Sequence, residues 1–279
     1  TKEDVIGAVD PSTGAETGAQ VIRQVYPRLG IVPGLILAPG WSQIPEVGLA
    51  LAAKAAKING VYSAMALLDL DTAKAKKYTD TKSVKEESGY TSPFCYPLWP
   101  CDRVGEYILA KNEKPGAMIQ YMASDNEDVP NQSPSNHLLG VGGQCLEDGT
   151  EVYLDQDQAN TVNGYGVTTA INQNGYRLWG NYTGAYPASS DAKDIWFAVR
   201  RMFSWQGNNF IQTYFDEVDD PMNNVLVQSV VDSENIRCSA YAPKYWAGAS
   251  IEHKSDDNPK TAILAGTMKF RQHLSLIHI

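Results

Sequence analysis

The acids that follow one apolar run are the residues of this sequence best placed to do chemistry. Asp69 and Asp71 end the segment 61–71, which reads as a buried strand, and open parallel sheets bind ligands at the carboxyl ends of such strands. With His137 and a serine, Asp69 could form a hydrolase triad. However, the sequence contains no G-x-S-x-G turn, and His137 lies in a polar loop before two leucines. A solvated loop histidine is the favoured interpretation, and a divergent hydrolase stays as an alternative.

Other residue types with metal or phosphate chemistry do not form a recognisable pattern. The four cysteines include no C-x-x-C pair and the four histidines are scattered, so we expect no zinc site and reduced thiols. The glycines of 140–143 are not followed by the Lys-Ser/Thr of a phosphate-binding loop. Asp155-x-Asp157 lacks the remaining ligands of a calcium loop. We therefore predict no catalytic residue, no metal and no cofactor.

Length and charge restrict the class of protein further. A chain of 279 residues with 43% hydrophobic content can form one large domain and a smaller one. The net charge of −9 argues against binding to nucleic acid, which needs a basic face. No apolar run approaches the roughly 20 residues that span a bilayer, so we expect no membrane insertion. The acidic run 216–220 reads as a solvated surface, with a docking patch as the alternative.

Short apolar runs alternate with helical patterns in the first part of the chain. The predicted strands are 33–39, 61–71 and 94–100, and the predicted helices are 12–28, 45–59, 72–78 and 115–124. Strand–helix–strand alternation with short connections implies a parallel sheet flanked by helices. We therefore predict an α/β domain over residues 1–165.

A β-hairpin is predicted around Asn174-Gly175, because a tight hairpin turn needs residues that tolerate positive φ. A two-residue turn there would pair Ile171 with Leu178. One face would then carry Ile171, Tyr176 and Leu178, and the other Ala170, Arg177 and Trp179. Since both faces hold large side chains, we expect cover on both sides, at a junction between domains or subunits.

The pattern changes after the hairpin, which indicates a second, α+β domain over residues 166–273. Asp191 is expected to cap a helix that carries Arg200 and Arg201 beside its apolar face. A second helix is predicted over 223–237, and two antiparallel strands over 246–253 and 261–270. The last residues, 274–279, resemble the translation of a sequencing-library adapter, and we expect them to be a non-native tail.

Five motifs in order resemble the tail sheath protein of contractile bacteriophages over nearly all of residues 5–273. The motifs are 34–71 (GLILAPGW…LLDLD), 133–143 (SPSNHLLGVGG), 163–183 (NGYGVTTAINQNGYRLWGNYT), 194–203 (DIWFAVRRMF) and 245–270 (YWAGASIEH…GTMKF). The resemblance implies a three-layer, subtilisin-like α/β domain without protease activity, followed by an incomplete sheath C-terminal domain. The missing hydrolase signatures agree with this.

The resemblance also implies a structural function and its partners. Sheath subunits form six-fold rings that stack helically around a tail tube, and their terminal arms add strands to the sheets of neighbouring subunits. Contraction drives the tube through the host envelope. The implied partners are the chain itself, the tail tube protein, the baseplate and the tail terminator, and the implied location is the virion tail after assembly in the host cytoplasm. A sheath from a related bacteriocin or secretion apparatus is the alternative.

The resemblance suggests interface residues as well. Arg200 and Arg201 match a basic pair on a helix, for which we expect a subunit or tube contact; the alternative is a solvated pair, or one bridged to the acids of 216–220. Tyr176, Arg177 and Trp179 are expected at the connection to the shared inner sheet. The family's terminal arms are missing from this sequence, so we expect residues 1–273 alone not to assemble into tubes. Replacing both arginines by Glu should abolish assembly and leave the melting temperature intact.

Overall fold

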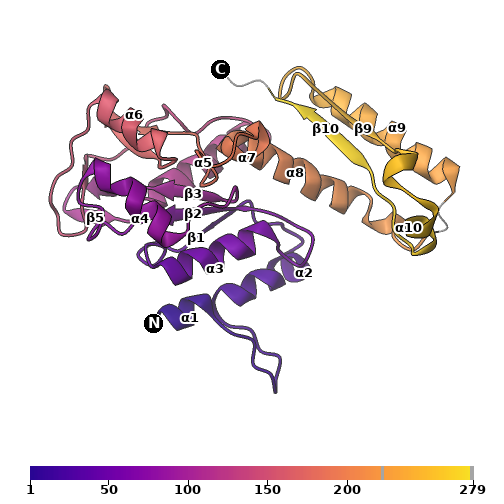
Figure 1. Cartoon of the computed structure of the whole chain (residues 1–279), viewed down its shortest axis with the longest axis horizontal. Coiled ribbons are helices and arrows are strands. Elements are labelled where there is room, and N and C mark those ends of the chain that lie inside the picture. The colour runs from indigo at the N-terminus through magenta and orange to yellow at the C-terminus, as the bar shows by residue number, and fades with distance from the viewer. Residues whose placement is uncertain (221–222, 277–279) are drawn as a thin grey trace. The chain divides into compact units, whose positions relative to one another are not determined.

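The computed structural model describes residues 1–220 and 223–276 and divides the chain into two compact units (Figure 1). These are Thr1–Asn208 and Asn209–Ile279. Among the described residues, no helix has both the length and the apolar character needed to cross a membrane.

A parallel sheet forms the centre of the first unit. Its strands are β1 (Leu35–Leu37), β2 (Met65–Asp69) and β3 (Cys95–Leu98), in the order β1-β2-β3. Helix α3 (Pro45–Ala56) connects β1 to β2, as the alternation of patterns predicts. All five residues of β2 are buried, which explains their uniformly apolar character up to Asp69. The mixed α/β architecture with a parallel sheet is thus confirmed.

The predicted hairpin forms a two-stranded sheet of its own, which an isolated bridge joins to the parallel sheet. Strands β7 (Thr169–Asn172) and β8 (Tyr176–Trp179) are antiparallel, and Thr168 bridges to Leu98 at the end of β3. The other edge of β8 is also occupied, because the Leu178 N–H donates to the His137 carbonyl and Leu138 bridges to Arg177. The hairpin is therefore an integral part of the first unit.

The register of the hairpin differs from the predicted one by one residue. Ala170 lies opposite Leu178 and Asn172 opposite Tyr176, so the loop has three residues, 173–175. Asn174 and Gly175 do adopt positive φ, as predicted. A one-residue shift exchanges faces along one strand: Ala170, Tyr176 and Leu178 share the buried face, and Ile171, Arg177 and Trp179 lie half-buried on the other. The predicted combination of faces was wrong.

A second, small sheet was not predicted. It contains β4 (Cys101–Val104), β5 (Tyr107–Leu109) and β6 (Gly143–Cys145) in the antiparallel order β5-β4-β6. These strands have three or four residues each, and β5 is largely exposed. Segments this short lack a readable alternation of apolar and polar residues.

The helices of the first unit agree with prediction only in part. Helix α5 (Glu113–Asp125) covers the predicted 115–124, whereas the predicted helix 12–28 is replaced by a Val9–Glu16 bridge, the 3-10 helix η1 (Gly18–Gln24) and α2 (Val25–Leu29). Gly18 has φ +55°, and a Cβ there would lie 2.3 Å from the Asp4 carbonyl, so a regular helix cannot pass this point. The remaining elements are α1 (Lys2–Ile6), η2 (Tyr78–Asp80), α4 (Thr81–Ser88), α6 (Gln156–Gly164) and α7 (Ala192–Ile195). The predicted helix 72–78 was wrong, since helical structure begins only at η2.

Helix α8 (Phe197–Thr213) begins in the core of the first unit. The Phe197 ring stacks on Tyr96 of β3 with ring centroids 4.1 Å apart, and both belong to the cluster that includes Leu67, Ala170 and Leu178. The boundary between the two compact units lies between residues 208 and 209. The boundary predicted from the sequence, between residues 165 and 166, comes earlier in the chain. The reason is that the hairpin buries its apolar face against the parallel sheet.

The second unit contains helices and a two-stranded sheet. Its elements are the end of α8, η3 (Phe215–Glu217), α9 (Asn224–Tyr241), β9 (Gly248–Glu252), η4 (Ser255–Asp257), α10 (Lys260–Leu264) and β10 (Arg271–Ser275). The predicted strand 261–270 was wrong, because Pro259 starts a short helix there and Gly266 follows it at φ +74°. β10 includes Leu274 and Ser275 of the expected tail, whereas 277–279 lie outside the described residues.

Candidate functional site

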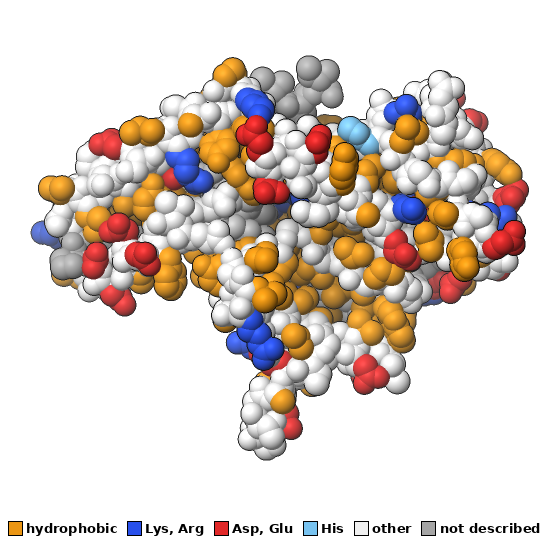
Figure 2. All heavy atoms as spheres, turned by 180° about the vertical axis from the view of Figure 1, so that it is seen from behind, with side chains coloured by type: hydrophobic (Ala, Val, Ile, Leu, Met, Phe, Trp, Pro, Cys, Tyr) orange, Lys and Arg blue, Asp and Glu red, His pale blue; other side chains and the backbone are white. Residues whose placement is uncertain are grey.

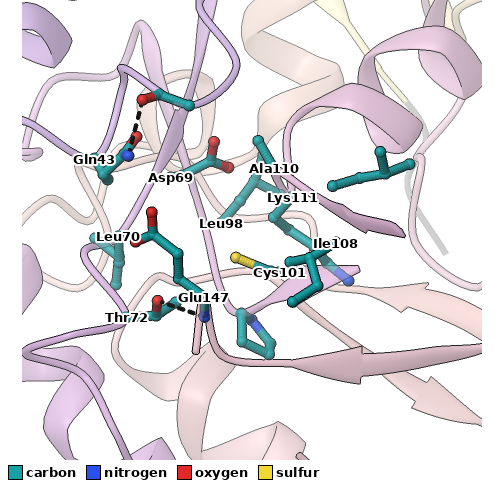
Figure 3. Close-up of a pocket in the computed structure, with 13 residues that line it drawn as sticks. Gln43, Asp69, Leu70, Thr72, Leu98, Cys101, Ile108, Ala110, Lys111 and Glu147 are labelled. Carbon is teal, nitrogen blue, oxygen red and sulfur yellow. Dashed lines mark hydrogen bonds between the residues drawn. The ribbon is translucent and has the colours of Figure 1, made fainter. Parts of the chain in front are cut away.

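The first candidate site is a cavity of about 130 Å³ at the carboxyl end of the parallel sheet (Figure 3). Asp69 from the end of β2 and Leu98 from the end of β3 line it, with Cys101 from β4 and Glu147 from the loop after β6. Open α/β sheets position ligands at this end of their strands. Asp69 thus lies at the carboxyl end of a strand of the parallel sheet, as predicted, and there it lines a cavity.

Asp69 is held by a serine rather than by a histidine. Asp69 Oδ2 accepts a hydrogen bond from the Ser42 hydroxyl at 3.0 Å. The backbone N–H of Asp69 donates in turn to Ser42 Oγ, also at 3.0 Å. His137 is exposed, and its carbonyl binds the backbone of β8. Among the described residues, no imidazole contacts Asp69, so the acid–imidazole–hydroxyl arrangement of a hydrolase is not formed.

Burial dominates the electrostatics of Asp69. Removal from water raises the pKa of its carboxyl to about 7, although the Ser42 hydroxyl and the Asn112 backbone oppose this change. Asp69 Oδ1 is buried and accepts no hydrogen bond of ordinary geometry from the described residues. The cavity thus has an incompletely paired acid on its wall.

A buried ion pair that the sequence did not suggest lies beside the cavity. Lys111 Nζ is 2.5 Å from Asp102 Oδ1, and both side chains are at most 1% exposed. Burial raises the pKa of the Asp102 carboxyl, and the Lys111 ammonium opposes that change. The pair joins β4 to the segment before α5. The sequence did not indicate this pair, because Asp102 and Lys111 are nine positions apart and belong to no recognisable motif.

No group of three or more His, Cys, Asp or Glu side chains in residues 1–220 and 223–276 could hold a metal ion. The cysteines of this region, Cys95, Cys101, Cys145 and Cys238, are free thiols. Burial raises the pKa of Cys101 to about 12, so its thiol is a poor nucleophile near neutral pH. The cavity can therefore bind a polar group, but its side chains do not form a recognisable catalytic set.

The hairpin residues singled out in the sequence make contacts inside the first unit. Tyr176 is buried in the core cluster. Arg177 donates through Nη1 to the Asn136 carbonyl at 2.8 Å, and Trp179 donates through Nε1 to Asn160 Oδ1 at 2.9 Å. These contacts connect β8 to its neighbouring segment and to α6. A role of these residues between subunits stays a prediction.

Arg200 and Arg201 also have surroundings within the chain. Arg200 Nη1 lies 2.8 Å from Asp194 Oδ1, and its guanidinium is 4.2 Å from the centre of the Phe94 ring. Arg201 is only 7% exposed, and burial lowers its pKa to about 10. The partner of Arg200 is thus Asp194 rather than the acids of 216–220. Replacing both arginines by Glu would bury new negative charge, so the melting temperature should not stay intact.

Arg200→Ala is expected to reduce the free energy of unfolding by about 1–2 kcal/mol, because a charge-assisted hydrogen bond and a cation–aromatic contact are lost. Urea unfolding of the variant measures this effect. Arg200→Lys keeps the charge but loses the planar contact with Phe94. Its free energy of unfolding should therefore lie between those of Arg200→Ala and the unmodified chain. Equal stability of all three proteins would show that the pair contributes nothing.

The second candidate site is the sheet of the second unit. β9 and β10 pair with each other, and no other described strand pairs with either. The outer edge of β9 is partly covered, because the Asn235 side chain of α9 accepts from the Ile251 N–H at 2.9 Å and donates to the Ile251 carbonyl at 3.1 Å. This contact was not predictable, since Asn235 lies in an ordinary helical pattern.

The outer edge of β10 is the free edge. In an antiparallel pair, the N–H and C=O of one residue point to the same side. Because Ile251 directs both toward Asn235, its register partner Gln272 directs both away from β9. No hydrogen bond to the outward backbone groups of β10 is found within the described part of the chain. This edge can therefore accept another strand.

Comparison with known proteins finds tail sheath proteins of phages and of a prophage among the relatives of this chain. No protein-family model matches the chain. The chain is 27% identical over 251 residues to the tail sheath protein of Burkholderia phage BcepMu, covering 84% of this chain and 50% of the relative. It is 30% identical over 206 residues to a putative prophage major tail sheath protein of Pseudomonas aeruginosa, covering 71% and 48%. The chain is a homologue of contractile tail sheath proteins.

A third sequence relative is similar over most of the chain, and two solved structures share its fold. The tail sheath protein of Escherichia phage P2 is 24% identical to this chain, and the match covers 96% of this chain and 66% of that protein. The fold matches the contracted sheath of an extracellular contractile injection system, with a TM-score of 0.71 at 16% identity over 94% of this chain and 72% of the other. It also matches the contracted helical sheath of the anti-feeding prophage, with a TM-score of 0.69 at 15% identity over 98% and 73%.

The chain spans about half the length of the first curated relatives it matches. The relatives are sheath proteins, which agrees with the prediction of a structural protein rather than an enzyme.

Proposed function

We propose that this sheath homologue is a structural subunit of a contractile phage tail sheath. It polymerises around the tail tube, and its contraction drives the tube through the host envelope. The named phage and prophage relatives support this role.

The free edge of β10 is the observation that carries the proposal. A two-stranded sheet with one unpaired edge can accept an added strand, and the most economical donor is a second copy of the chain. Subunits linked in this way would form six-fold rings that stack helically, with the tail tube, the baseplate and the tail terminator as further partners. The assembled protein would reside in the virion tail, after assembly in the host cytoplasm.

The finer description of the fold belongs to this proposal as well. The first unit would correspond to the subtilisin-like sheath domain, whose central parallel sheet and flanking helices it has. The second unit would belong to the sheath C-terminal domain. Surface charge is compatible with protein partners: acidic and basic side chains are mixed over the face shown in Figure 2.

Gln272→Pro tests strand addition at β10. Proline removes the outward N–H of residue 272 but none of the hydrogen bonds to β9, because those come from its neighbours. The variant, in its complete gene product, should lose self-assembly in sedimentation and negative-stain microscopy. Its melting temperature should change by only a few degrees, since the β9–β10 pairing is kept.

Two further variants make this result interpretable. Gln272→Ala keeps the backbone N–H and should assemble normally. Ser250→Pro removes an N–H that faces β10, so it should lower the melting temperature of the second unit as well as assembly. Normal tubes from the Gln272→Pro protein would contradict strand addition at this edge.

A sheath of a related contractile injection apparatus is a second candidate. The similarity of the fold to such sheaths favours it. The genes beside this one distinguish the two, because a phage tail is encoded together with capsid and packaging proteins.

A further inference from the structure

The cavity at the carboxyl end of the parallel sheet is not used by the sheath function proposed above. Its volume of about 130 Å³ far exceeds the roughly 10–15 Å³ that a single water needs on the same measure. Figure 3 shows the side chains of Asp69, Glu147 and Cys101 around it. The cavity therefore has room for a small group of several non-hydrogen atoms.

The charges around the cavity are unbalanced. Asp69 and Glu147 both line it, and Glu147 is exposed at its mouth. Lys111 is the only Lys or Arg among the lining residues, and its ammonium lies 2.5 Å from Asp102, which is not among them. Since Asp102 already neutralises the Lys111 ammonium, the carboxyl groups of Asp69 and Glu147 leave the lining of the cavity with a net negative charge.

One oxygen of the buried acid that lines the cavity lacks a hydrogen-bond donor. Asp69 is 6% exposed, and its Oδ2 is occupied by the Ser42 hydroxyl. Its Oδ1 accepts no hydrogen bond of ordinary geometry, and neither does Oδ1 of Asn112, whose amide nitrogen donates to Ser42. A buried carboxylate is costly unless a cation or a hydrogen-bond donor pairs with it. A ligand that is both positively charged and a hydrogen-bond donor would therefore pair with Asp69.

The chemistry of the lining selects an ammonium group over a metal ion. Hard cations need about six oxygen ligands, and the described residues contain no group of three acidic or other metal-ligating side chains suitable for a metal. An ammonium brings its own N–H donors and needs only one or two carboxylates. The apolar lining, from Leu70, Leu98 and Ile108, suits a short alkyl chain.

We propose that this cavity binds a primary alkylammonium group, with Asp69 as its buried counter-ion and Glu147 at its mouth. The group enters with its nitrogen toward Asp69 and its carbon chain along the apolar wall. It can belong to a free small amine or to a lysine side chain of another protein, and both present the same chemistry to the cavity.

Titration with n-propylammonium chloride at constant ionic strength tests the proposal. Calorimetry and the backbone amide shifts of residues 69–72 and 147 in NMR spectra should show saturable binding, with a dissociation constant on the order of millimolar. Propanol has the alkyl chain without the charge, and tetrapropylammonium has the charge without an N–H and with greater bulk. Neither should bind in the cavity.

Three variants locate the interaction. Asp69→Asn keeps the shape of the side chain and should weaken binding at least ten-fold, while Glu147→Gln should weaken it several-fold. Glu106→Gln removes an equal charge from the exposed turn between β4 and β5 and should change nothing. If propanol matched propylammonium, or if Glu106→Gln had the effect of Asp69→Asn, the proposal would be overturned.

A second ligand separates the two sources of the amine. Nα-acetyl-lysine methylamide carries the same ammonium on a peptide backbone. If it binds as well as propylammonium, the cavity accepts a lysine of another protein. If only propylammonium binds, the ligand is a free amine, and the cavity is a small-molecule site.

Discussion

Lys111→Met is expected to reduce the free energy of unfolding by about 3–5 kcal/mol near neutral pH, because it leaves a buried carboxylate without its counter-charge. Asp102 is fully buried and Lys111 is 1% exposed, so water cannot replace the lost ammonium. Methionine keeps most of the volume of the side chain, which excludes a cavity as the main cause. Urea unfolding, followed by near-ultraviolet circular dichroism, measures the loss.

Two comparisons separate charge from packing in this experiment. The double variant Asp102→Leu with Lys111→Met removes both charges, and buried ion pairs replaced in this way are commonly neutral or stabilised; it should recover most of the loss. Burial already raises the pKa of Asp102, so in the single variant this carboxyl should protonate more readily and the loss should shrink as pH falls toward 5. A loss below about 1 kcal/mol at neutral pH would show that the pair is not the buried contact described here.

Asp69→Asn should instead stabilise the protein above neutral pH. The pKa of Asp69 is about 7 in the folded chain, against 3.8 for an aspartate surrounded by water, so between these values the folded state holds more protons than the unfolded state. Stability therefore falls as pH rises from about 4 to about 7, and the full cost is present above pH 7. A pKa shift of this size corresponds to a loss of about 4 kcal/mol in the free energy of unfolding above pH 7. Asparagine carries no charge but is itself imperfectly hydrogen-bonded at this position, so Asp69→Asn should restore about 3 kcal/mol of that loss.

Unfolding measurements across this pH range test the sign. Asp69→Asn and the unmodified chain should differ most near pH 8 and least near pH 4. Glu106→Gln is the matched control, because its exposed carboxylate should produce no comparable difference. A constant difference at all pH values would assign the effect of Asp69→Asn to packing rather than to charge.

Local patterns predicted some elements of the fold well. The buried run of β2 and the amphipathic helix α3 were recognised because their residue types and spacing specify the structure locally. The turn at Asn174-Gly175 was recognised for the same reason, since both residues tolerate positive φ. Asp69 was placed at the carboxyl end of the sheet because it comes at the end of the apolar run that forms β2.

Other features depended on contacts between distant segments. The hairpin register is decided by Ala170, Tyr176 and Leu178 packing into a core built from β2, β3 and α8. No local pattern contains that core, and a shift of one residue leaves the turn residues almost equally favourable. The same packing moves the unit boundary to 208/209.

The candidate sites show this division most clearly. From the sequence alone, the order of its motifs determined the resemblance to sheath proteins, and its missing signatures determined the expectation of no catalysis. Only the tertiary structure decided that Lys111 neutralises Asp102, that Asp69 faces a cavity without an imidazole, and that Asn235 covers β9 while β10 stays open. Each of these depends on which buried groups find a partner, and pairing across the fold is set by three-dimensional packing rather than by neighbours in the chain.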